Sequence, residues 1–74
     1  MTLEHGTRQE HIETLQRAKE NEVSSIWSGD LRNDYLRENL AFAEEEGIIK
    51  ASPYDYADAQ ESGFDIEWLE HPEV

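Results

Sequence analysis

One apolar stripe that ends at a glycine limits what this chain can fold into more than any other feature. Leu36, Leu40 and Ala43 step by four and three positions, as residues on the buried face of a helix do. Gly47 follows the stripe, and a left-handed glycine closes a helix in the Schellman motif. The pattern predicts a helix over residues 31–46 that ends sharply at Gly47.

A first helix is predicted upstream. Thr7 and Glu10 have the spacing of a capping box, in which each side chain accepts a hydrogen bond from the other residue's backbone N–H. Good helix formers continue to about residue 22, with Ile12 and Leu15 as the main apolar positions. This apolar face is narrow, so we expect the helix to lie on the outside of the core.

The segment between the two helices, residues 23–29, is short and carries two large apolar side chains. We expect a single helical turn or a tight loop that directs Ile26 and Trp27 into the core. Asp30 is the expected N-cap of the second helix, and Asn33 is a later alternative.

Two strands are predicted after the second helix. Residues 48–51 form a short β-branched run bounded by Pro53. Residues 64–68 alternate between apolar and acidic side chains, as a half-buried strand does, and they include Trp68, which we assign to the core. We expect residues 53–63 to form a long loop, with room for one helical turn around residues 56–59.

The chain has 74 residues, enough for a single domain with a modest core, and we expect residues 1–6 and 70–74 to be frayed. It has no cysteine, no signal-peptide pattern and no apolar run long enough to span a membrane. These features favour a cytoplasmic protein.

Charge is the strongest signal in the composition. The net charge is −12, and residues 51–74 contribute seven acids and no cation. Such acidity is compatible with plain solubility, with adaptation to high salt, and with imitation of a polyanion that engages a basic partner. It opposes nucleic-acid binding, which normally rests on a basic surface.

The order of the expected elements resembles the winged helix-turn-helix group. The match is most specific over residues 36–49, which read LRENLAFAEEEGII, because the third helix of that group ends on a similar pattern and runs into the wing hairpin. The resemblance covers roughly residues 9–69; the middle helix is shorter than usual, and alanine replaces the common leucine at position 43. It implies that the start of the third helix reads DNA bases, through Arg32, Asn33 and Arg37.

The acidic clusters suggest an opposite interpretation, in which the chain binds a basic protein through a face that imitates nucleic acid. Exposed tyrosines commonly anchor interfaces, so two tyrosines of the long loop join the candidates. The candidate partner-binding residues are Glu44, Glu45, Glu46, Tyr54, Asp55, Tyr56, Asp58, Glu61, Asp65 and Glu67.

No catalytic or metal-binding pattern is present in the sequence. The spacing of Asp55, Asp58 and Glu61 does not fit a calcium loop, and the three histidines are scattered. No nucleophile has a base at a useful spacing. We expect no cofactor, no metal and no enzymatic activity.

The sequence therefore predicts a small α+β, winged-helix-like domain with two main helices, a short helical turn and a C-terminal β-hairpin with a long loop. Its expected function is that of a non-catalytic regulatory module that binds a protein partner, and we expect no association with a membrane. A DNA-binding transcriptional regulator is the alternative, and a protein acidified for high salt with another role stays open.

Overall fold

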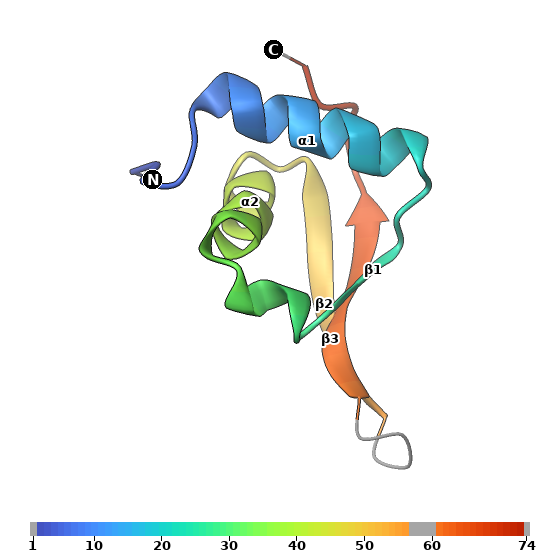
Figure 1. The fold of residues 1–74 in the computed structure, drawn as a ribbon. Coiled ribbons are helices and arrows are strands. Elements are labelled where there is room, and N and C mark those ends of the chain that lie inside the picture. The colour runs from blue at the N-terminus through green and yellow to red at the C-terminus, as the bar shows by residue number, and fades with distance from the viewer. Residues whose placement is uncertain (1, 57–60, 74) are drawn as a thin grey trace.

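The computed structural model describes residues 2–56 and 61–73, without the side chains of Asp55, Tyr56 and Glu61. Two helices and a 3-10 turn pack on one face of a three-stranded antiparallel sheet with the strand order β1-β3-β2 (Figure 1). The expected α+β class is confirmed, with one strand more than predicted. The elements are α1 (Arg8–Glu20), β1 (Ser25–Trp27), η1 (Asp30–Arg32), α2 (Asp34–Glu45), β2 (Ile49–Tyr56) and β3 (Glu61–Trp68).

The start of α1 is the predicted capping box. The Thr7 hydroxyl accepts a hydrogen bond from the Glu10 amide at 3.1 Å, and the Glu10 carboxylate accepts one from the Thr7 amide at 3.2 Å. Ile12 and Leu15 are buried, as expected, while most of the other α1 side chains are exposed. The helix therefore lies on the outside of the core, and it crosses the end of the sheet where β2 begins and β3 ends (Figure 1).

The helix α2 begins later than its main predicted start. The Asn33 side chain accepts hydrogen bonds from the amides of Tyr35 and Leu36, so the alternative cap is the one used. Residues Asp30–Arg32 form the 3-10 turn η1 instead of the first helical turn. An asparagine cap sets the start of the helix, because its side chain accepts hydrogen bonds from amides that would bond to backbone carbonyls if the helix began earlier.

The end of α2 is the predicted Schellman motif. Gly47 has a φ of 73°, its amide donates to the Glu44 carbonyl at 3.1 Å, and the Ile48 amide donates to the Ala43 carbonyl at 2.9 Å. Both Ala43 and Ile48 are buried. The chain consequently turns from α2 directly into β2.

The prediction of a helical turn or loop for residues 23–29 is wrong, because Ser25–Trp27 form the strand β1. β1 pairs with β3: the Ser28 amide donates to the Ser62 carbonyl at 2.8 Å, and the Ile66 amide donates to the Ser24 carbonyl at 2.7 Å. The assignment of Trp27 to the core is also wrong, since this side chain is 54% exposed. In a strand, successive side chains point to opposite faces, so Ile26 and Trp27 cannot both face inward.

The hairpin is longer than predicted, and the expected loop over residues 53–63 is wrong in extent. β2 continues through Pro53 to Tyr56, and β3 starts at Glu61, which pairs with Tyr56. The helical turn expected around residues 56–59 does not form at Tyr56, which belongs to β2, and residues 57–59 lie outside the described part of the chain. Pro53 is compatible with β2 because β2 is an outer strand of the sheet.

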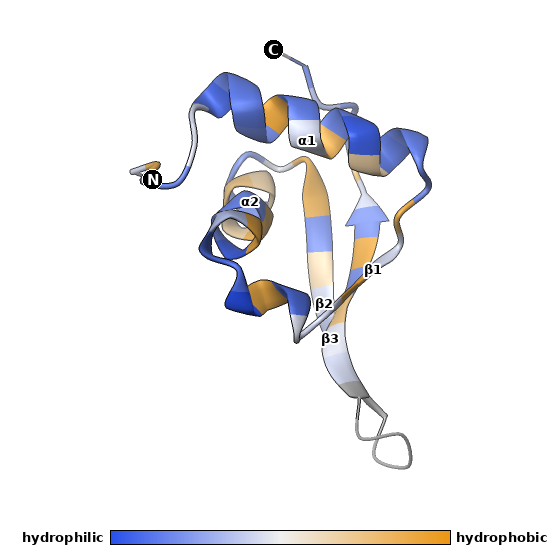
Figure 2. Ribbon diagram, viewed as in Figure 1, coloured by the Kyte–Doolittle hydropathy of each residue, from blue (hydrophilic) through white to orange (hydrophobic). Residues whose placement is uncertain are grey.

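The core lies between the helices and the inner face of the sheet. Figure 2 shows apolar and hydrophilic residues alternating along β2 and β3. Leu36, a member of the predicted stripe, is 37% exposed and lies at its edge. Trp68 packs against the core as predicted, and its indole N–H donates to the Val23 carbonyl at 2.8 Å. The buried apolar side chains are Ile12, Leu15, Leu40, Phe42, Ala43, Ile48, Ile49 and Ile66.

The structure gives specific contacts to several of the terminal residues that we expect to be frayed. The amides of Glu4 and His5 donate to the Glu38 carboxylate. Pro72 is buried, and its carbonyl accepts a hydrogen bond from Gln16 of α1 at 3.0 Å. Within the described part of the chain, no helix has the length and apolar character needed to cross a membrane.

Candidate functional site

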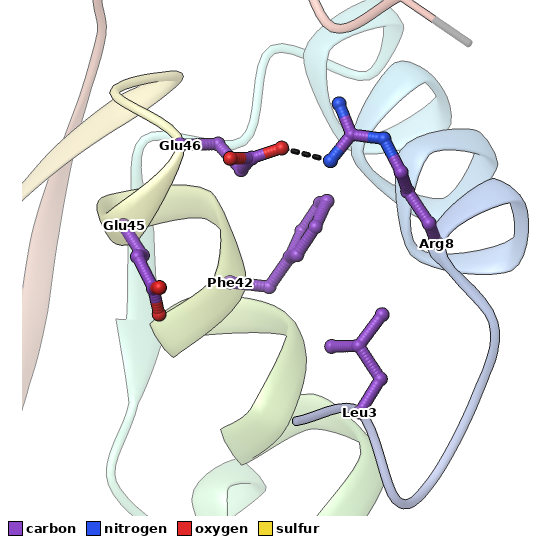
Figure 3. A pocket seen from close by; sticks show the side chains of 5 residues that line it. All are labelled: Leu3, Arg8, Phe42, Glu45 and Glu46. Carbon is purple, nitrogen blue, oxygen red and sulfur yellow. Dashed lines mark hydrogen bonds and ion pairs between the residues drawn. The ribbon is translucent and has the colours of Figure 1, made fainter. Parts of the chain in front are cut away.

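The structure separates the predicted acidic residues into two groups. Glu44, Glu45 and Glu46 lie where α2 ends, beside α1. Glu46 forms an ion pair with Arg8, and the Arg8 guanidinium also lies 5.4 Å from the centre of the Phe42 ring (Figure 3). A cationic side chain of this chain therefore already faces this end of the helix.

A shallow pocket of about 190 Å³ opens next to this ion pair. Figure 3 shows Phe42 at its centre, with Leu3 on one side and the Arg8–Glu46 pair on the other. Arg8 lines this pocket together with Glu45 and Glu46, so the pocket is less negatively charged than the sequence suggests.

The second group lies on the face of the sheet that points away from the helices, which we call the outer face. Register places Tyr54 opposite Gly63 and Asp65 opposite Ser52, so these side chains share that face. Asp65 and Glu67 are exposed on it. The outer face consists of Ser25, Trp27, Lys50, Ser52, Tyr54, Gly63, Asp65 and Glu67.

Two aromatic residues flank Gly63 on the outer face. Trp27 of β1 and Tyr54 of β2 both pair with Gly63 of β3. A Cβ atom on Gly63 would come within 2.8 Å of the Tyr54 hydroxyl oxygen and 2.1 Å of the Ile26 carbonyl oxygen. Glycine therefore permits the close approach of β1 and lets the tyrosine lie over β3.

The Trp27 ring rests on a second glycine. A Cβ atom on Gly29 would lie 2.3 Å from the ring, so only a glycine leaves room for the indole in this position. An indole that is held in place and still 54% exposed is a candidate contact residue, because tryptophan is enriched among the residues that dominate binding at protein interfaces. The sequence assigned Trp27 to the core and not to a contact surface. The one signal against that assignment is that Trp27 directly follows the apolar Ile26, because consecutive residues of a strand face opposite sides of the sheet.

For the remaining candidates of the hairpin, the structure describes at most the backbone. Asp55 and Tyr56 belong to β2 and Glu61 belongs to β3. Asp58 lies outside the described residues. The site is therefore built from Trp27 and from the described side chains of the two neighbouring strands.

The candidate DNA-reading residues at the start of α2 are largely used within the chain. The Asn33 side chain caps the helix. Arg37 forms an ion pair with Asp34, and it donates to the Leu31 carbonyl at 3.2 Å. Arg32 is exposed at the end of η1. An arginine paired with a neighbouring acid offers less positive charge to phosphate than the sequence suggested.

A polar cluster that the sequence did not reveal joins α1 and α2 to the N-terminal segment, residues 2–6. The Glu38 carboxylate accepts hydrogen bonds from the amides of Glu4, at 2.6 Å, and His5, at 2.8 Å, and it lies 2.9 Å from Nε2 of His11. The pKa of Glu38 is lowered from its ordinary 4.5 to about 2, mainly because its carboxylate accepts the hydrogen bond from the Glu4 amide. Burial raises this pKa, while the contact with His11 and the hydrogen bond from the His5 amide lower it further.

The hydrogen bonds of Asn39 define the tautomer of His11. The Asn39 amide nitrogen donates to the His11 backbone carbonyl at 3.1 Å, which orients the amide, and it lies 3.0 Å from Nδ1. Nδ1 therefore accepts, so Nε2 carries the proton and donates it to Glu38. His11 is 0% exposed and stacks on Tyr35 with ring centroids 4.6 Å apart. The cluster is closed to a substrate, and its role is to hold the three segments together.

One pattern in the sequence could have indicated this cluster. His11 lies four residues before Leu15 and Glu38 lies four residues before Phe42, so both polar side chains occupy the buried face of their helix. A charged residue on a buried face needs a partner, and a histidine on the facing helix can provide one.

The side chains of the described residues offer no obvious centre for metal chemistry. Across residues 2–56 and 61–73, no three histidine or acidic side chains come together as a metal site. What the described surface presents is an exposed indole beside a tyrosine, with carboxylates next to them. A scan against protein-family models, a search of curated proteins and a search of solved structures each find no match to the chain.

Proposed function

We propose that this protein is a small, non-catalytic regulatory module that binds a basic protein partner through the outer face of its sheet. The observation that carries the proposal is Trp27, which is 54% exposed, rests on Gly29 and shares its face with Tyr54. Rigid, exposed aromatic side chains supply most of the affinity at many protein interfaces. We expect the protein to act in the cytoplasm.

The charges around the aromatic pair support a basic partner. Asp65 and Glu67 are exposed on the outer face, where Lys50 is the one cation among the described side chains. The whole chain carries −12. A negative field of this kind accelerates encounter with a basic surface and repels phosphate.

The winged-helix resemblance remains part of the proposal. The order of helix, strand, helical turn, helix and hairpin supports it. The alternative function, DNA binding through Arg32, Asn33 and Arg37, receives less support because Asn33 and Arg37 are engaged within the chain.

The proposal is tested with a partner captured on the tagged protein and identified by mass spectrometry. Trp27→Ala should weaken binding of that partner by increasing its rate of dissociation. The double variant Asp65→Asn with Glu67→Gln should reduce the association rate, and added salt should reproduce this effect in the unmodified protein. Both rates are measured by surface plasmon resonance.

The matched control is the double variant Glu13→Gln with Glu20→Gln, which removes the same charge from the exposed side of α1. It should change the association rate less than the outer-face variant does. If Trp27→Ala and the outer-face variant bound the partner like the unmodified protein, the proposal would be wrong. A DNA gel shift at about 0.15 M salt that Arg37→Ala abolished would favour the alternative function.

A further inference from the structure

The free edge of the sheet at β1 is open to another strand. The amide of Ser28 and the carbonyl of Ser24 bond to β3, so the even-numbered residues of this segment direct their backbone groups toward β3. Alternation then directs the backbone groups of Ser25 and Trp27 away from the sheet. Within the described part of the chain, these edge groups have no hydrogen-bonding partner.

The opposite edge of the sheet is protected. β3 uses its even-numbered residues to bond β1, so it bonds β2 through its odd-numbered residues, such as Asp65, which pairs with Ser52. This register directs the backbone of Pro53, opposite Phe64, toward the free edge of β2. Proline has no N–H, and it is a common means of preventing strand addition at an edge. The described part of β1 contains no such residue.

A groove runs beside the open edge on the inner side of β1. Its volume is about 310 Å³, and its apolar lining includes Ala18 of α1, Ile26 of β1 and Leu36 of α2. The groove exists because only the three-residue turn η1 lies between β1 and α2. Leu36 is 37% exposed there, which leaves an apolar surface ready for contact.

We propose that β1 accepts an extended segment of the partner protein as a fourth strand of the sheet. In this arrangement the added strand bonds to the backbone of Ser25 and Trp27. Its residue opposite Ile26 faces inward and enters the groove, and its neighbours on either side lie on the outer face. The inference rests on the proposed function and specifies how that partner binds.

The charges define the chemistry of the added strand. Among the residues that the structure describes, Asp30 is the only charged one that lines the groove, and Asp65 lies opposite Ser25 on the outer face. Lysine or arginine residues on the outer face of the added strand can reach Asp65 and the Trp27 ring. The best occupant is therefore an extended segment in which one apolar residue lies between two basic ones.

Hydrogen exchange detects strand addition directly. The probe is a capped peptide of alternating lysine and valine, added to the isotope-labelled full chain. The amides of Ser25 and Trp27 should exchange rapidly in the free protein and at least about tenfold more slowly with the peptide. The amides of Ser28 and Ile66, which already donate hydrogen bonds between the β1 segment and β3, serve as internal references. A peptide with glutamate in place of lysine should leave the exchange unchanged.

A proline substitution provides the decisive variant. Ser25→Pro removes an N–H that faces away from the sheet, so the β1–β3 hydrogen bonds remain. An added strand would lose its hydrogen bond to this N–H and would clash with the proline ring. Peptide affinity should fall at least about tenfold, with the fold verified by circular dichroism. Leu36→Lys, which places a cation in the groove and does not alter β1, should also weaken binding, and it replaces Ser25→Pro if that variant does not fold.

The outcomes separate this inference from the proposed function. If Ser25→Pro and Leu36→Lys bound the partner normally while Trp27→Ala did not, strand addition would be wrong and the proposed function would stand. If the Ser25 and Trp27 amides were protected in the free chain in a concentration-dependent way, a second copy would occupy the edge and the inference would be overturned. Normal binding by Trp27→Ala and by the outer-face variant would instead refute the proposed function.

Discussion

Leu36 and Leu40 lie one turn apart on α2, yet Leu40 is 7% exposed and Leu36 is 37% exposed. Leu40 packs in the core cluster with Ile49 and Ile66. Leu36 instead lines the groove beside β1, because the short turn η1 does not cover it. The predicted stripe is therefore divided between the core and the surface.

This difference predicts unequal effects of the same truncation. Leu40→Ala should lower the free energy of unfolding by about 2–5 kcal/mol, as truncation of a buried leucine does. Leu36→Ala, the matched control, should cost less because part of the side chain is already in water. Urea denaturation of the two variants measures both values. Equal losses would show that Leu36 contributes to the core as much as Leu40 does.

Gly47 should resist substitution for a conformational reason. A Cβ atom there would meet nothing within 4 Å, so the site has space, but its φ of 73° is unfavourable for other residues. Gly47→Ala should therefore destabilise the protein by about 1–2 kcal/mol in urea denaturation. Gly47→Asn should cost less, since asparagine tolerates the left-handed conformation. If alanine and asparagine were equally costly, the Schellman ending would not be the reason.

Glu38 should make stability depend on pH in acid. Its pKa is lowered in the folded protein to about 2, from 4.5, so the folded state favours the charged carboxylate. The resulting stabilisation is fully present above pH 4.5 and is lost as the pH falls through about 2. Protonation removes an acceptor from the amides of Glu4 and His5.

The measurement is urea denaturation of the unmodified protein and Glu38→Gln across this pH range. The variant should be less stable near neutral pH, and the difference in free energy of unfolding should shrink between pH 4.5 and about 2. Glu20→Gln, which removes an exposed carboxylate from α1, controls for the loss of one charge. A difference that stayed constant over this range would show that Glu38 is not the group responsible.

Part of the candidate site was predictable from the sequence. Tyr54, Asp65 and Glu67 were selected from the sequence, and the register places them together on the outer face. Trp27 was assigned to the wrong side, because its position depends on pairing with Gly63 far along the chain. The glutamates that end α2 lie at the surface, as expected, but no pattern of neighbouring residues indicates that Arg8 pairs with Glu46.

The sequence by itself determined the features that depend on neighbouring residues. The capping box at Thr7, the Schellman ending at Gly47 and the alternation of residues 64–68 each use contacts within a few positions, so the local residue types are sufficient. These features establish where α1 begins, where α2 ends and which side of β3 faces the core.

Only the tertiary structure decided the features that join distant segments. Three residues become the strand β1 because β3, near the other end of the chain, supplies their hydrogen-bonding partners. Likewise, Glu38 is stable as a buried carboxylate because His11, which is 27 positions away, and the N-terminal amides meet it there. A strand or a buried charge is stabilised by its partner, and the local sequence does not identify a partner that folding brings from elsewhere in the chain.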